Sequence, residues 1–171
     1  MKLSLFNTPE KHFSDVCSMD DRLVYDAGVT GAKEQFTEIL DKEPVEYTSV
    51  LQEAAYIEDA DGSKSSVNII APEEADRLNR FIGLRDWESG KDYFLPEEGA
   101  LISRNYTKNR DVDVGDTIRI MDMKGIYHNC RIVGITDYYL PSTQLVMSRG
   151  YYEKIMSQPV LWEQPSAVYF H

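Results

Sequence analysis

The fold is decided by Ser166-Ala167-Val168-Tyr169-Phe170, an apolar run that follows Pro159 and Pro165 near the end of the sequence. Its β-branched and aromatic residues predict a strand. We expect this strand to pair back into the sheet formed by the first part of the chain. Both chain ends would then lie on one α/β body.

The first part of the chain supplies the elements to which that strand would pair. Strands are predicted from β-branched and aromatic runs, and helices from apolar residues at three- and four-residue steps. The predicted elements are, in order, a strand over 22–25, a helix over 30–42, one long or two broken strands over 45–58, a strand over 66–71 and a helix over 72–82. With the last strand added, this order predicts an α+β fold with a ferredoxin-like split βαβ subdomain.

The middle of the chain has frequent turn signals and little helical periodicity, which predicts a small β-rich unit. Gly115 is placed for a tight turn before a strand over 117–121, and Lys124-Gly125 joins that strand to one over 126–136 as a hairpin. A strand over 144–147 follows, and Ser148 is expected to cap a short helix. We therefore predict two subdomains: an α/β subdomain of residues 1–85 plus 158–171, and an inserted β-rich subdomain of residues 86–157.

Composition limits the classes of function. The hydrophobic fraction of 42% is that of a folded protein, and the net charge of −11 would repel a phosphate backbone, so nucleic-acid binding is disfavoured. No run of apolar residues is long enough to cross a bilayer, and the first residues lack the pattern of a secretory signal. If the intact protein is membrane-bound, its spanning segments are expected outside this sequence.

No catalytic, cofactor or metal site is predicted. The sequence contains neither a GxSxG elbow nor a glycine-rich phosphate loop. Cys17 and Cys130 have no CxxC partner, and we favour two buried thiols over a disulfide between them. His128 stands two residues from Cys130, and a packed strand histidine is favoured over a ligand or base.

Two further groups of residues are candidate sites. The acidic stretches Asp59-Ala60-Asp61-Gly62 and Asp111-Val112-Asp113 lack the spacing of a calcium loop, so we interpret them as solvated turns. Tyr138, Tyr139 and Leu140, just before Pro141, form an apolar run expected at a loop. They are candidate partner-binding residues, the alternative being that their rings close the β-rich unit against the first one.

Several motifs in the run from Gly90 to Tyr152 resemble a known family. The matching pieces are Leu101-Ile102-Ser103 after an acidic-Gly turn, Val114-Gly115-Asp116-Thr117-Ile118, Arg131-Ile132-Val133-Gly134-Ile135, and the pair Tyr151-Tyr152 after the strand Leu145-Val146-Met147. In their order and spacing these pieces resemble the extracytoplasmic domain of ABC-transporter permeases of the FtsX/MacB type, the MacB-like periplasmic core domain. Residues 22–85 have a weaker likeness to this family. By this resemblance the α/β subdomain would be porter-like and the inserted β-rich subdomain sabre-like.

The resemblance implies a non-enzymatic module at the extracytoplasmic side of the cell membrane. Its partners would be the transmembrane helices of the same permease, a separate cytoplasmic ABC ATPase, and an extracytoplasmic peptide, lipid or protein. The family's roles include peptide or antibiotic export, resistance, and lipoprotein release, among which the sequence does not choose.

Two other functions are compatible with parts of the sequence. A β-rich unit beside an α/β unit makes clefts, which is compatible with a small hydrolase or another enzyme without a recognisable motif. The turn at Val114-Gly115-Asp116 also occurs in AbrB-type swapped-hairpin regulators, but the charge of −11 argues against contact with DNA.

Overall fold

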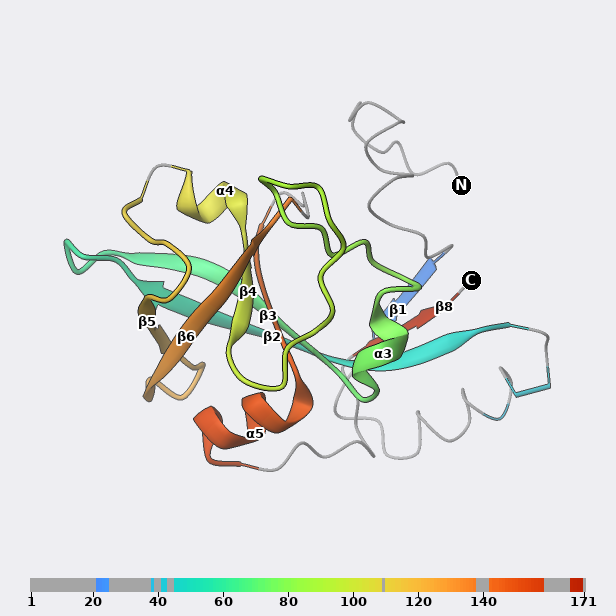
Figure 1. The fold of residues 1–171 in the computed structure, drawn as a ribbon. Helices are drawn as coiled ribbons and strands as arrows, with labels where there is room; N and C mark the ends of the chain where they lie inside the picture. Colours follow the sequence, from blue (N-terminus) through green and yellow to red (C-terminus); the bar gives the residue numbers. More distant parts are fainter. Residues whose placement is uncertain are drawn as a thin grey trace, which may run out of the picture.

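The structure is a computed structural model that describes residues 21–24, 38, 41–42, 45–108, 110–137, 142–158 and 167–170. The described part is a mixed α/β fold consisting mostly of sheet (Figure 1). Its elements are β1 (Asp21–Val24), β2 (Tyr47–Glu58), β3 (Lys64–Pro72), α3 (Ala75–Leu78), β4 (Ala100–Ser103), α4 (Arg104–Thr107), β5 (Thr117–Met121), β6 (Tyr127–Thr136), β7 (Thr143–Met147), α5 (Arg149–Met156) and β8 (Ala167–Phe170). The prediction of an α+β protein is confirmed at this level.

The strands form one eight-stranded sheet in the order β1-β8-β2-β3-β7-β4-β6-β5. An additional pairing joins β5 to the end of β2, so six of these strands close into a ring. The length of β2 makes this possible, because its first residues pair with β8 and its last three with β5. We call β2, β3, β7, β4, β6 and β5 the ring.

The closing strand pairs where the sequence predicts. β8 lies between β1 and β2 and is antiparallel to both, with Asp21 opposite Phe170 in the register. A ferredoxin-like unit would place β3 between β1 and β2, so that finer detail of the prediction is not reproduced. Since β2 and β3 belong to the ring together with β4 to β7, the sheet is continuous across the predicted subdomain boundary at residue 85.

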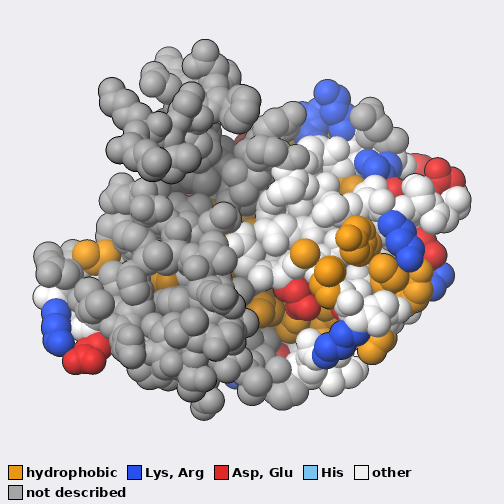
Figure 2. Space-filling model, turned by 180° about the vertical axis from the view of Figure 1, so that it is seen from behind, with side chains coloured by type: hydrophobic (Ala, Val, Ile, Leu, Met, Phe, Trp, Pro, Cys, Tyr) orange, Lys and Arg blue, Asp and Glu red, His pale blue; other side chains and the backbone are white. Residues whose placement is uncertain are grey.

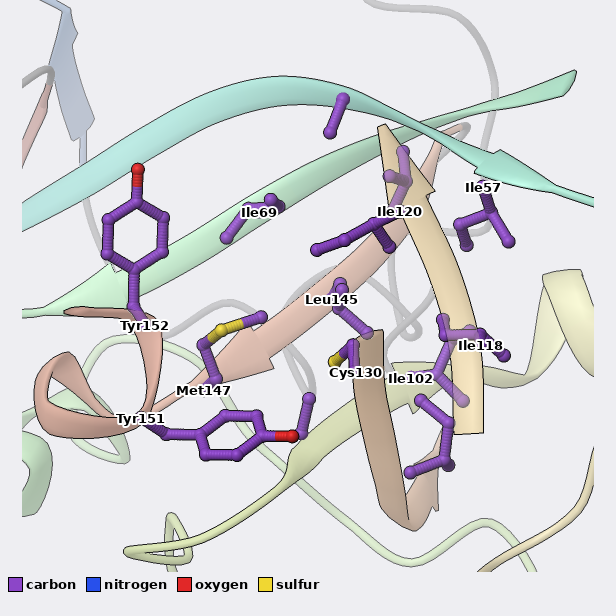
Figure 3. Packing of buried hydrophobic residues seen from close by; sticks show 14 of the residues in the cluster. Ile57, Ile69, Ile102, Ile118, Ile120, Cys130, Leu145, Met147, Tyr151 and Tyr152 are labelled. Atoms are coloured by element: carbon purple, nitrogen blue, oxygen red, sulfur yellow. The ribbon is translucent and has the colours of Figure 1, made fainter. Parts of the chain in front are cut away.

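The interior of the ring is the main core. Apolar side chains alternate along the strands, and those that point inward, such as Ile57, Ile69, Ile120 and Leu145, are fully buried (Figure 3). α5 contributes Tyr151 and Tyr152 to the same cluster. A ring of six strands is therefore filled by its own side chains and leaves no channel.

A second cluster covers the outer side of β3, β7 and β4. Leu78, Phe81 and Ile82 pack there against Ile70 and other strand residues. The helix predicted over 72–82 is reduced to the four residues of α3, because the ladder between β2 and β3 runs on through Pro72, and Glu73 N donates to Ser49 O (2.9 Å). The pairing of β2 with β3 thus takes the residues that would have formed the first helical turn.

The remaining predicted elements of the β-rich unit are confirmed. The Gly115 φ of 103° makes the predicted tight turn, and β5 spans the predicted 117–121. The Ser148 side chain caps α5 by accepting from Tyr151 N (3.2 Å). Most of the helix predicted over 30–42 lies outside the described residues.

The ring consists of two equivalent units, β2-β3-β4-α4 and β5-β6-β7-α5. Within each unit the first two strands are antiparallel, and the second strand of each pairs parallel with the third strand of the other. The first strands pair with each other, as do the third strands, and in these ladders equivalent residues face one another, Ile57 opposite Ile120 and Leu101 opposite Val146. The fold therefore has an internal pseudo-twofold axis.

The sequence carries the same repeat. Leu-Ile-Ser-Arg-Asn-Tyr at 101–106 corresponds to Val-Met-Ser-Arg-Gly-Tyr at 146–151. The two hairpin turns correspond as well: Asp59 N donates to Ser63 O (2.8 Å) and Asp122 N to Ile126 O (2.9 Å). Gly62 and Gly125 each have a φ of 82° in these turns. We call these the first turn (59–63) and the second turn (122–126).

Candidate functional site

The carboxylate of Asp59 begins the first turn and joins it to α4. Asp59 Oδ1 accepts from Tyr106 Oη (2.6 Å) and Arg110 Nε (2.8 Å), and Oδ2 accepts from Ser65 Oγ (2.6 Å). Arg110 also donates to Ser65 Oγ (2.7 Å) and stacks on the Tyr106 ring, 4.4 Å from its centroid. We call these four residues the Asp59 network.

The network explains how the carboxyl group titrates. Burial alone would raise the pKa of Asp59, but the hydrogen bonds from Ser65, Tyr106 and Arg110 outweigh it and lower the pKa to about 2. Burial, followed by the bond to Asp59, raises the pKa of Tyr106. The solvated turn predicted at 59–62 is therefore wrong for Asp59, whose side chain is only 13% exposed.

Asp59, Tyr106 and Arg110 of the network line a groove of about 1030 Å³ between the first turn and the segment after α4. Its two guanidinium groups are already neutralised, Arg110 by Asp59 and Arg119 by Glu58 (2.8 Å). Ser65 Oγ accepts from Arg110 while donating to Asp59, which makes it a poor nucleophile. A carboxyl group with a pKa of about 2 is likewise a poor general base.

The second turn carries the equivalent carboxylate, Asp122, with a different partner. His128 Nε2 lies 3.0 Å from Asp122 Oδ2, and His128 Nδ1 lies 2.9 Å from Ile155 O in α5. Ile155 O and Asp122 Oδ2 can each accept a hydrogen bond from an imidazole N–H. The bond from His128, ahead of two backbone N–H donors, lowers the pKa of Asp122. We call these residues the Asp122 network.

This geometry gives His128 the packed role that the sequence favours. It connects the end of α5 to the second turn, and its side chain is 8% exposed. Cys130 is a buried free thiol, and burial raises its pKa to about 12. Within the described residues no group of three or more His, Cys, Asp or Glu side chains could hold a metal ion.

The partner-binding residues predicted from the sequence, Tyr138, Tyr139 and Leu140, lie outside the described residues. Cys17 does as well. The helices that the structure describes include none long and apolar enough to cross a bilayer.

An exposed apolar surface was not found from the sequence. Tyr56, Met121 and Tyr127 face one another across β2, β5 and β6, since Met121 is the register partner of both tyrosines. Met123 and Ile126 extend this row onto the second turn and are 62% and 54% exposed. We call these five residues the hairpin surface. The sequence alone does not reveal this surface, because its residues come together only when β5 pairs with the end of β2.

Figure 2 shows hydrophobic side chains interspersed with basic and acidic side chains on the side of the molecule where β5 lies, away from β1 and β8. Two basic side chains approach the hairpin surface at Tyr127: Arg119 lies 4.3 Å from the ring centroid and Lys64 5.7 Å. These contacts are of the cation–π type.

Comparison with known proteins adds no relative: no family model matches the chain, and no curated protein is similar to it.

Proposed function

We propose that the chain is the extracytoplasmic domain of an ABC-transporter permease of the FtsX/MacB type, which binds a partner or substrate and transmits force. The observation that carries the proposal is the pairing of β1 with β8, in which Asp21 faces Phe170. A domain inserted between two membrane-spanning segments needs its two attachment points close together, and this pairing supplies them.

The path for force follows from the same strands. β8 is hydrogen-bonded on one side to β1 and on the other to β2, and β2 continues into the ring. A displacement of the two ends would reach the ring through this ladder. On this proposal residues 1–85 plus 158–171 act as the porter-like part and residues 86–157 as the sabre-like part, and the ATPase is a separate subunit.

The two networks support a non-enzymatic role. The carboxylates of Asp59 and Asp122 bond to protein groups that hold a turn against a helix, and neither stands beside a free nucleophile. The alternative of a small hydrolase would need such a pair in the groove near Asp59. The swapped-hairpin alternative would need a second chain to complete the strands, whereas the ring closes within one chain.

Fractionation of the producing cells tests the proposal. The gene product that contains these 171 residues is expected in the membrane fraction, at a mass well above 19.6 kDa. Protease added to the outside of cells stripped of their outer layers is expected to cleave it. A product of 19.6 kDa in the cytosolic fraction would contradict the proposal.

Tyr138, Tyr139 and Leu140 remain the proposed partner-contact residues of this domain. Replacing both tyrosines by serine (Y138S/Y139S) separates the two interpretations. Unchanged melting with weaker association of the ATPase-coupled complex with its partner supports contact. A lower melting temperature supports packing within the domain.

A further inference from the structure

The two hairpin turns of the ring allow a controlled comparison, because they share one backbone geometry. Each starts with an aspartate whose N–H bonds to the carbonyl four residues on, and each has a glycine with a φ of 82° at the same place. The first turn carries Ala60 and Ser63 where the second carries Met123 and Ile126. Folding of the turn therefore does not require apolar residues at these positions.

The apolar residues of the second turn are also not used for packing. Met123 is 62% and Ile126 54% exposed, while the equivalent positions of the first turn hold small side chains. Tyr56, Met121 and Tyr127 are register partners over three strands, and Met123 and Ile126 follow them in the turn that joins β5 to β6. Apolar side chains gathered at one end of a hairpin in this way mark an interaction surface rather than scattered surface residues.

The charges around the row indicate which charge a bound partner should carry. The chain carries a net charge of −11, yet Lys64 and Arg119 border the row together with their register partner Glu58, and Lys124 lies in the second turn. Arg119 is paired with Glu58, but no carboxylate of the described residues lies within ion-pair distance of Lys64 or Lys124. Lys64 Nζ contacts Met121 Sδ (3.2 Å), and Lys124 Nζ contacts Gln158 Oε1 (3.3 Å).

We infer that the hairpin surface docks a partner protein segment that presents apolar side chains bordered by carboxylates. The apolar side chains would cover the row from Tyr56 to Tyr127, and the carboxylates would meet Lys64 and Lys124. A second copy of this chain does not fit in a twofold contact, because it would present the same lysine-bordered row and not the carboxylates that would complement Lys64 and Lys124. The inference is independent of the transport proposal and applies to the chain by itself.

Selection from a displayed library of random peptides against the full chain tests the inference. Enriched peptides are expected to combine Leu, Phe, Tyr or Trp with Glu or Asp. Their dissociation constants are expected to rise about tenfold or more for M123S/I126S, and also for K64E/K124E, because both remove interactions at the centre or rim of the surface. Raising the salt concentration should weaken binding to the wild-type chain.

The matched control is Val114→Ser, which removes an exposed apolar side chain, 56% exposed, outside the hairpin surface. It should leave peptide binding unchanged. Because Met123 and Ile126 are exposed, M123S/I126S should have the same melting temperature as the wild-type chain, which a melting curve checks.

Four results would overturn the inference. They are the absence of enriched peptides, enrichment of peptides without acidic residues, binding that M123S/I126S leaves intact, and preferential binding to vesicles of phosphatidylcholine and phosphatidylglycerol. The last result would assign the surface to an anionic membrane.

Discussion

The two units of the ring share strands, register and turn geometry, but they fasten their helices differently. In the first unit Tyr106 and Arg110 bring α4 to Asp59, while in the second His128 brings the end of α5 to Asp122. In both cases the carboxylate at the start of the turn is the anchor. The two units therefore share the aspartate at the start of the turn, whereas its partners and the outer turn residues differ between them.

The largest effect is expected from Asp59→Ala. Four hydrogen-bond donors lose their acceptor, namely those of Ser63, Ser65, Tyr106 and Arg110. The guanidinium of Arg110 is also left partly buried without a counter-ion. Loss of one partner of such a pair costs about 3 kcal/mol of the free energy of unfolding, or about 6–12 °C in melting temperature. Denaturant titration measures it. Asp111→Ala, which removes an exposed carboxylate lining the same groove, is the control and should cost less than about 0.5 kcal/mol.

The Asp59 network also predicts a dependence on acid. Folding lowers the pKa of Asp59 from 3.8 to about 2, so its contribution is complete above the unfolded value and is lost as the pH falls through the folded one. Wild-type stability should therefore decline between about pH 4 and pH 2 more steeply than that of Asp59→Asn. If the free energies of unfolding of the two proteins fell in parallel as the pH is lowered, the ionised Asp59 carboxylate would make no contribution to stability.

A smaller loss is expected from His128→Ala. It removes the contacts of His128 with Ile155 O in α5 and with Asp122 Oδ2, while Asp122 Oδ1 keeps its bonds from Lys124 N and Ile126 N. This loss costs about 2 kcal/mol. The equivalent change in the first unit, Ser65→Ala, leaves Tyr106 and Arg110 on Asp59 and should cost about 1 kcal/mol. Hydrogen exchange of the α5 amides should rise only in the histidine variant. An equal rise in both would mean that His128 does not fasten the helix.

The glycines of the two turns should respond alike. Gly62→Ala and Gly125→Ala each force a side chain into a left-handed backbone in open space, at a cost of about 1 kcal/mol. Gly150→Ala should instead stabilise the fold, because Gly150 lies in α5 without positive φ. The free energy of unfolding should rise by about 0.5–1 kcal/mol. The melting temperatures of the three variants, compared with that of the wild-type chain, measure these changes. Costs that differ strongly between the two turns would break their equivalence.

The smallest effect is expected when the second turn receives the residues of the first. M123A/K124D/I126S keeps Asp122 and Gly125 and should change the free energy of unfolding by less than about 0.5 kcal/mol. A loss above about 1 kcal/mol would mean that the exposed apolar residues stabilise the fold, and the hairpin surface would lose its support as a docking surface.

Local signals were sufficient for most of the strands. The turn at Gly115, the strand over 117–121 and the Ser148 cap depend on neighbouring residues, and each is confirmed. The helix expected after Pro72 failed because a long-range ladder with β2 took its first residues. Strand pairing at a distance outweighed local helical preference there.

Long-range features were beyond this kind of prediction. Closure of the ring depends on three residues of β2 pairing with β5, which no single-strand pattern reveals. The internal repeat was visible in Leu101–Tyr106 and Val146–Tyr151, and a search of the sequence against itself could have found it. Asp59 was misjudged because its partners Tyr106 and Arg110 come from a distant segment.

The adjacency of Asp21 and Phe170 is what places the two proposed attachment points side by side. In a C17S/C130A background that still melts cooperatively, D21C/F170C should form an intramolecular disulfide on mild oxidation, since partners in antiparallel strands lie within bonding reach. Mass spectrometry of the non-reduced monomer should find the two peptides joined. Free thiols after oxidation, or cross-links only between molecules, would contradict a domain whose two attachment points share one strand pair.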